Sequence, residues 1–102
     1  MGLSVIAEDE NGLELRAFHD PGNILHALLP RQDDTSFVTL RFIDWAGDTV
    51  FNRLQIGEFI TECERLLRDP RTGEERDTVH QLIELARLVE SRAHLYLRFV
   101  GD

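Results

Sequence analysis

Two consecutive stretches of helical periodicity, residues 56–68 and 74–93, constrain the fold more than any other feature of the sequence. The apolar positions of the first stretch are Ile56, Phe59, Ile60, Cys63, Leu66 and Leu67, and those of the second are Val79, Leu82, Ile83, Ala86, Val89 and Ala93. Asp69-Pro70 ends the first stretch, and Thr72 with Glu75 forms a capping box before the second. The sequence therefore predicts two helices whose apolar stripes pack on another layer.

The N-terminal residues predict a β-hairpin that belongs to this second layer. Strands over 3–7 and 13–18 flank Asn11-Gly12, a strong hairpin signal. A loop of three or five residues, with Gly12 in the left-handed conformation, is preferred, because a two-residue loop would place Glu8 beside Leu15. The preferred register predicts one shared apolar face made of Leu3, Val5, Ala7, Leu13, Leu15 and Ala17.

Two further hydrophobic segments predict the rest of the sheet. The segment 35–44 is rich in β-branched and aromatic residues and predicts a central strand, joined through "WAGD" to a strand over 49–54. Val38, Leu40 and Phe42 are expected beneath the helices, whereas Phe37 and Ile43 are expected on the opposite face beside Trp45. The closing segment 94–102 predicts a strand with Leu95, Leu97 and Phe99 on one face and Tyr96, Arg98 and Val100 on the other.

The segment "HDPGN", residues 19–23, predicts a turn. Pro21 restricts its own backbone angle, Gly22 supplies a positive φ, and Asn23 caps a helix over 24–29 that Pro30 ends. The run is short enough to form a strand instead, and both alternatives stay open.

Together these elements predict an α+β fold in the order β-β-(α)-β-β-α-α-β. A mostly antiparallel sheet of about five strands carries the two C-terminal-half helices on one face, and residues 1–102 form a single domain. The order of the strands within the sheet is left open.

The charge of the chain bears on its partners. Nineteen acidic residues stand against eleven basic residues, all arginine, which gives a net charge of −8. Such a chain repels nucleic-acid phosphates, and a basic protein partner suits it better. No apolar run is long enough to span a membrane, and the acidic N-terminus is unlike a signal peptide. The single Cys63 suits a reducing compartment, so a cytoplasmic location is expected.

Two places in the sequence are candidates for catalysis. Asp44 and Asp48 around Trp45 could form a carboxylate pair, but Asp and Gly are also ordinary residues of a hairpin loop, which is the preferred interpretation. His19-Asp20 could be a base with its orienting carboxylate, or part of the turn beside Pro21.

Metal and nucleophile signals are weak. His80 and Glu84 are four residues apart on a helix, but no established metal motif is present, and no metal or other cofactor is expected. Cys63 falls on an apolar helical stripe and is expected to be a buried, unreactive thiol.

The remaining signal is an acidic rim around outward-facing aromatic and apolar residues, which is typical of a protein-binding face. The predicted interface consists of Phe37, Ile43, Asp44, Trp45, Asp48 and Tyr96. The leading hypothesis is a small, acidic, non-enzymatic protein-binding module, comparable at the level of class to immunity proteins that neutralise a basic toxin. One alternative is a homodimeric structural or regulatory subunit, and another is a small enzyme or ligand-binding domain centred on His19, Asp20 and Asp44.

Overall fold

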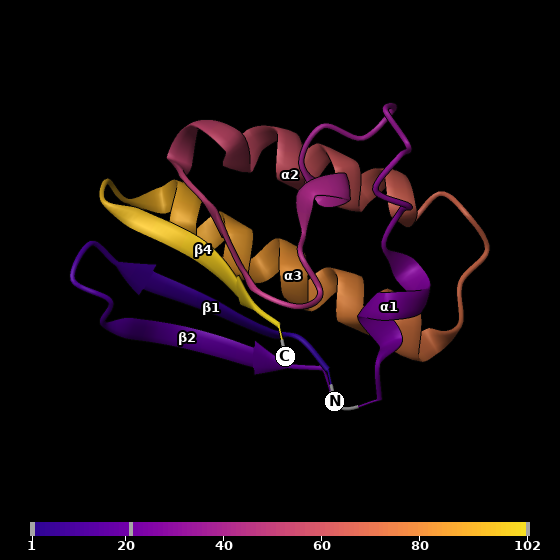
Figure 1. Ribbon diagram of the computed structural model, residues 1–102, viewed down its shortest axis with the longest axis horizontal. Helices are drawn as coiled ribbons and strands as arrows, with labels where there is room; N and C mark the ends of the chain where they lie inside the picture. Colours follow the sequence, from indigo (N-terminus) through magenta and orange to yellow (C-terminus); the bar gives the residue numbers. More distant parts are fainter. Residues whose placement is uncertain (1, 21, 102) are drawn as a thin grey trace.

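The computed structural model describes residues 2–20 and 22–101, which form an α+β fold with one antiparallel sheet (Figure 1). The elements in chain order are β1 (Ser4–Asp9), β2 (Glu14–His19), α1 (Ile24–Leu28), the 3₁₀ helix η1 (Leu40–Phe42), β3 (Asp48–Phe51), α2 (Arg53–Leu66), α3 (Gly73–Ser91) and β4 (Leu95–Val100). The short helix expected over 24–29 is present as α1. Within the described residues the sheet has four strands rather than about five.

The strands lie in the order β2-β1-β4-β3, and every neighbouring pair is antiparallel. In Figure 1, α3 passes behind the strands and α2 runs above them along α3, while α1 and η1 lie beside the sheet. The sheet therefore has one face packed on the long helices and one face that the described helices leave open.

The hairpin of β1 and β2 forms as expected around Gly12, whose φ is +80°. Its register differs from the prediction, because Val5 pairs with Phe18 and Ile6 pairs with Ala17, with an irregularity between Ala7 and Glu8. Phe18 thus shares the helix-facing side with Val5, and the prediction that Leu13, Leu15 and Ala17 lie there is wrong. A phenyl ring buries more apolar surface against α3 than the alanine methyl would, which favours this register.

The segment 35–44 forms no strand, and this prediction is wrong. It belongs to a long connection between α1 and β3 that lies beside the sheet in Figure 1. The carboxylate of Glu62 in α2 accepts hydrogen bonds from the backbone N–H groups of Val38 (2.6 Å), Thr39 (3.1 Å) and Leu40 (3.0 Å), and from the Thr39 hydroxyl (2.7 Å). Backbone donors that a strand would use for a neighbouring strand are therefore bound by a side chain.

The burial pattern of this segment follows from that arrangement. Phe37, Leu40 and Ile43 are 6%, 1% and 2% exposed, whereas Val38 and Phe42 are 54% and 56% exposed. The buried apolar side chains are three residues apart and not two as in a strand, and Thr39 between them is buried where its hydroxyl bonds Glu62. The expected burial of Val38 and Phe42 is therefore wrong, and so is the expected exposure of Phe37 and Ile43.

Capping residues set the beginnings of the long helices. α2 begins at Arg53, three residues before the predicted range, because the Asn52 side chain accepts a hydrogen bond from the Leu54 N–H and Gln55 bonds back to the Asn52 N–H. The predicted strand over 49–54 is accordingly shortened to β3, which pairs with β4 and not with residues 35–44. The capping box of Thr72 and Glu75 is confirmed, with bonds of 2.9 and 3.1 Å.

The hydrophobic core lies between the sheet and the helices. Its centre is an aromatic group in which the ring of Phe59 lies 5.5 Å from that of Phe51 and 5.9 Å from that of Phe99. Leu95, Leu97 and Phe99 face this core, as the alternation of the last segment predicts. Cys63 is also fully buried, and burial raises the pKa of its thiol well above the usual range.

Candidate functional site

The six residues predicted for the interface do not form one surface. Phe37 and Ile43 belong to the core, so neither side chain reaches a partner in this conformation. Phe37 is further covered by Arg65, whose guanidinium lies 4.0 Å from the centre of its ring.

Trp45 and Asp44 lie in the connection that precedes β3. Trp45 is partly buried against the core. The centroid of its ring lies 4.6 Å from that of His26, and the two ring planes are inclined by 64°. The Asp44 carboxylate accepts a hydrogen bond from the Ala46 N–H, and the Asp44 N–H donates to the Thr49 hydroxyl. These contacts make the segment 44–49 a closed turn.

The proposed carboxylate pair is divided between two environments. Asp48 is part of β3, where it accepts a hydrogen bond of 3.1 Å from Arg98, whereas Asp44 bonds within its own turn. His19 and Asp20 likewise bond to different groups, not to each other. The His19 Nδ1 lies 2.8 Å from the Ser4 hydroxyl, and the Asp20 carboxylate accepts hydrogen bonds from two backbone N–H groups of α1.

Asp20 takes the capping role that the sequence assigned to Asn23. Its two oxygens accept from Ile24 N–H (3.0 Å) and Leu25 N–H (2.9 Å), and the residue is buried. Asn23 instead supplies the positive φ of the turn, at 57°, which the sequence assigned to Gly22, and it makes no side-chain cap. Pro21 lies outside the described residues.

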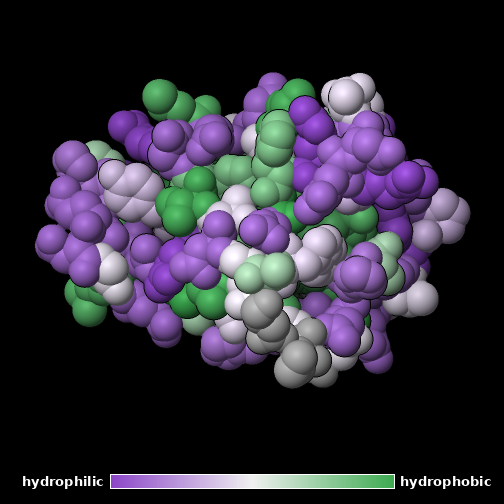
Figure 2. Space-filling model, viewed as in Figure 1, coloured by the Kyte–Doolittle hydropathy of each residue, from purple (hydrophilic) through white to green (hydrophobic). Residues whose placement is uncertain are grey.

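The open face of the sheet carries the most distinctive arrangement of side chains. Its middle row runs across all four strands as Ala17, Ile6, Arg98 and Val50, because Ile6 pairs with both Ala17 and Arg98, and Arg98 pairs with Val50. Tyr96 and Val100 lie on the same face of β4. Figure 2 shows this face with green side chains over the strands, and again over the beginning of α2, separated by purple polar groups.

Arg98 occupies the centre of the open face between two carboxylates. Its Nε donates to Glu8 at 3.0 Å, and its Nη1 donates to Asp48 at 3.1 Å. The hydrogen bond that Arg98 donates to Asp48, together with the charge of Glu8, raises the pKa of Arg98 further above its ordinary value. The guanidinium is therefore held between two carboxylates, in the same row as Ile6 and Val50. The three charged groups together have one net negative charge.

The buried carboxylate of Glu62 is a possible catalytic group that the geometry explains otherwise. Burial alone would raise the pKa of Glu62, but the hydrogen bonds from Leu40, Val38 and Thr39 lower it below the ordinary value. Both oxygens are occupied by groups of the chain itself. Glu62 therefore anchors the connection between α1 and β3.

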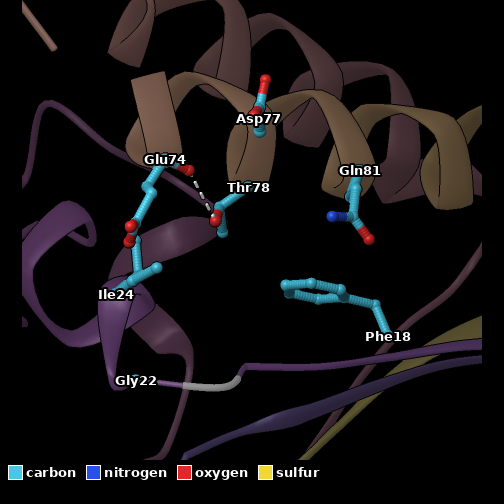
Figure 3. A pocket seen from close by; sticks show the side chains of 7 residues that line it. All are labelled: Phe18, Gly22, Ile24, Glu74, Asp77, Thr78 and Gln81. Atoms are coloured by element: carbon cyan, nitrogen blue, oxygen red, sulfur yellow. Dashed lines mark hydrogen bonds between the residues drawn. The ribbon is translucent and has the colours of Figure 1, made fainter. Parts of the chain in front are cut away.

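A hollow of about 430 Å³ opens between α1, the end of β2 and the first half of α3 (Figure 3). Its lining consists of Phe18, Gly22, Ile24, Glu74, Asp77, Thr78 and Gln81. In Figure 3 the ring of Phe18 turns one face towards α3, and Gln81 points down towards it. Glu74 extends from α3 towards Ile24, while Asp77 lies on the outer rim with its carboxylate turned away from the ring. Pockets that bind small ligands have volumes of roughly 300–1,000 Å³, so this hollow is large enough to be one.

Comparison of the chain with protein-family models, curated proteins and solved structures gave no match. Over residues 2–20 and 22–101, no cluster of three histidine, cysteine or acidic side chains could hold a metal ion. None of the helices described is both long and apolar enough to cross a membrane.

The open face was only partly foreseen from the sequence. Alternation along β4 placed Tyr96, Arg98 and Val100 on one face, and the structure confirms this placement. Ile6 and Val50 were missed as members of this face, because their cross-strand neighbours depend on a strand order that was left open. Phe18 was missed as part of the hollow because the predicted hairpin register placed it on the opposite face of β2.

Proposed function

We propose that this chain is a small, non-enzymatic protein-binding module that presents the open face of its sheet to a partner. The observation that carries the proposal is the row of Ile6, Arg98 and Val50 at the centre of a sheet face that no described helix covers. Arginine and tyrosine are enriched at energetic centres of interfaces, and Tyr96 stands next to this row. Of the interface residues expected from sequence, Tyr96 and Asp48 are retained in this proposal, and Ile6, Glu8, Val50 and Arg98 join them.

A basic partner suits this face best. Glu8 and Asp48 together exceed the charge of Arg98, and the whole chain has a net charge of −8. Complementary charge would speed association and favour a basic surface over an acidic one. Inhibition of a basic toxin, as in immunity proteins, is one form that such binding could take. The lone, buried Cys63 agrees with action in the cytoplasm.

The test is a capture experiment with a matched pair of variants. Ile6→Asp places a charge at the centre of the open face, whereas Leu54→Asp makes the same change at a side chain that is 92% exposed at the beginning of α2. The proposal expects a protein that is retained by the wild type and by Leu54→Asp, and lost with Ile6→Asp. With the purified partner, affinity should fall as salt is raised from low to physiological concentration, since exposed charges are screened within about 8–10 Å. A partner retained equally by both variants would place the interface elsewhere.

Self-association is the second candidate, and one observation favours it. The open face carries charges of both signs, with Arg98 between Glu8 and Asp48, so two copies related by a twofold axis could pair these charges reciprocally. Light scattering distinguishes the two functions. A homodimer has twice the mass of the chain at low and high salt and becomes a monomer in Ile6→Asp, whereas a module for a basic partner stays monomeric alone.

A further inference from the structure

We propose that the hollow between α1, β2 and α3 receives an arginine or lysine side chain of a protein partner. This inference goes beyond the open sheet face and rests on the proposed function only in taking the occupant from a protein. The hollow opens to solvent, so the backbone of a partner can remain outside while one side chain enters.

The apolar walls fit the aliphatic part of such a side chain. Phe18 and Ile24 are both partly buried and pack against the core, so their positions are fixed by the fold. The Thr78 hydroxyl donates to the Glu74 carbonyl at 2.9 Å and is therefore already bonded within α3. Lysine and arginine bury their methylene stems on apolar surface of this kind while the charged end stays near water.

The polar groups that remain are complementary to a cation. Glu74 contributes a carboxylate and Gln81 contributes an amide, while the carboxylate of Asp77 lies on the outer rim. None of the seven lining residues is basic. The exposed face of the Phe18 ring adds an attraction for a cation placed over it. Arg16 does not line this hollow; it lines a smaller neighbouring hollow together with Glu84.

Helix stabilisation explains only part of this arrangement. Glu74 is in the first turn of α3, where a negative charge favours the helix dipole. That effect does not account for the Gln81 amide or for the Phe18 ring, which face the same space.

The experiment is a titration of the ¹⁵N-labelled chain, followed by amide chemical shifts, with arginine blocked at both ends as the N-acetyl N-methylamide. The matched probe is blocked citrulline, which has nearly the same shape and no charge. We expect the arginine probe to shift the amides of Phe18, Ile24 and Gln81. The citrulline probe should bind about tenfold more weakly, as one partly exposed ion pair with Glu74 and a cation–π contact imply.

Variants locate the effect. Glu74→Gln/Asp77→Asn should weaken arginine binding by about fivefold or more. Glu58→Gln/Glu90→Gln removes the same charge from exposed positions on α2 and the far half of α3, and should leave binding unchanged. Three results would each overturn the proposal. They are equal affinity for the arginine and citrulline probes, amide shifts spread over other acidic loops, and equal affinity of the two double variants for the arginine probe. The proposal would also be overturned if agmatine, a guanidine with a free amine, bound tenfold more tightly than blocked arginine, because the hollow would then be assigned to a small molecule.

Ile6→Asp, titrated in parallel, keeps this test separate from the proposed function. The hollow of that variant is intact, so arginine binding should be unchanged while capture through the open face is lost. Failure of the titration with successful capture rejects only the hollow, and the reverse result rejects only the open face.

Discussion

Replacing Glu62 with alanine should destabilise the protein more than any other change of a polar side chain. Its carboxylate accepts three backbone N–H bonds and one hydroxyl bond from Val38, Thr39 and Leu40, and Glu62 itself is 5% exposed. Leaving a buried donor without a partner costs about 1–3 kcal/mol. Water can reach the part-buried Val38 N–H, so the expected loss comes from the other two backbone donors and totals about 3–5 kcal/mol.

The measurement is urea unfolding followed by fluorescence of Trp45, the single tryptophan, which lies in the connection that Glu62 anchors. The matched control is Glu58→Ala, an exposed position one turn earlier in α2, where the change should stay within about 0.5 kcal/mol. Equal unfolding free energies for the two variants would refute the anchoring role of Glu62.

The same side chain should make stability depend on pH. Hydrogen bonds keep the folded-state pKa of Glu62 below its ordinary value, despite burial, so the unfolded chain binds the proton more tightly. The stabilisation is therefore complete above the unfolded pKa of about 4.3, and it is lost as the pH falls through the folded value. Glu62→Gln should be less stable than the wild type at about pH 6, and this difference should shrink at about pH 3. A difference that stays constant over this range would contradict the reasoning.

Three further predictions concern the hairpin, the thiol and the aromatic residues. Gly12→Val should lower the free energy of unfolding by about 1–2 kcal/mol or more, because valine disfavours a φ of +80°; an unchanged urea midpoint would contradict this. Cys63 should react slowly with thiol reagents in the native protein and rapidly in urea, since burial raises its pKa; fast native labelling would mean that α2 opens readily. Phe99→Ala should cost about 3–5 kcal/mol, and Phe42→Ala much less because its ring is 56% exposed; similar losses in urea unfolding would show that Phe42 is packed.

Features that depend on neighbouring residues in the chain could be predicted from the sequence alone. The capping box of Thr72 and Glu75, the positive φ of Gly12 and the alternation of the last strand all follow from local chemistry, and the structure confirms each. The two long helices were predicted for the same reason, since an apolar stripe at helical spacing is visible within one segment.

The tertiary structure alone decided features that depend on distant residues. Residues 35–44 have strand-forming composition, but Glu62, more than twenty positions later, binds the backbone groups that a strand would need. The face of β2 that packs inward was decided in the assembled fold, where Phe18 pairs with Val5 and packs against the core. The open face likewise exists only because β4 lies between β1 and β3, which brings Glu8 and Asp48 to opposite sides of Arg98. Local propensities are worth tenths of a kilocalorie to about 1 kcal/mol per residue. Burial of one aromatic ring, or the set of hydrogen bonds that one buried carboxylate accepts, outweighs them.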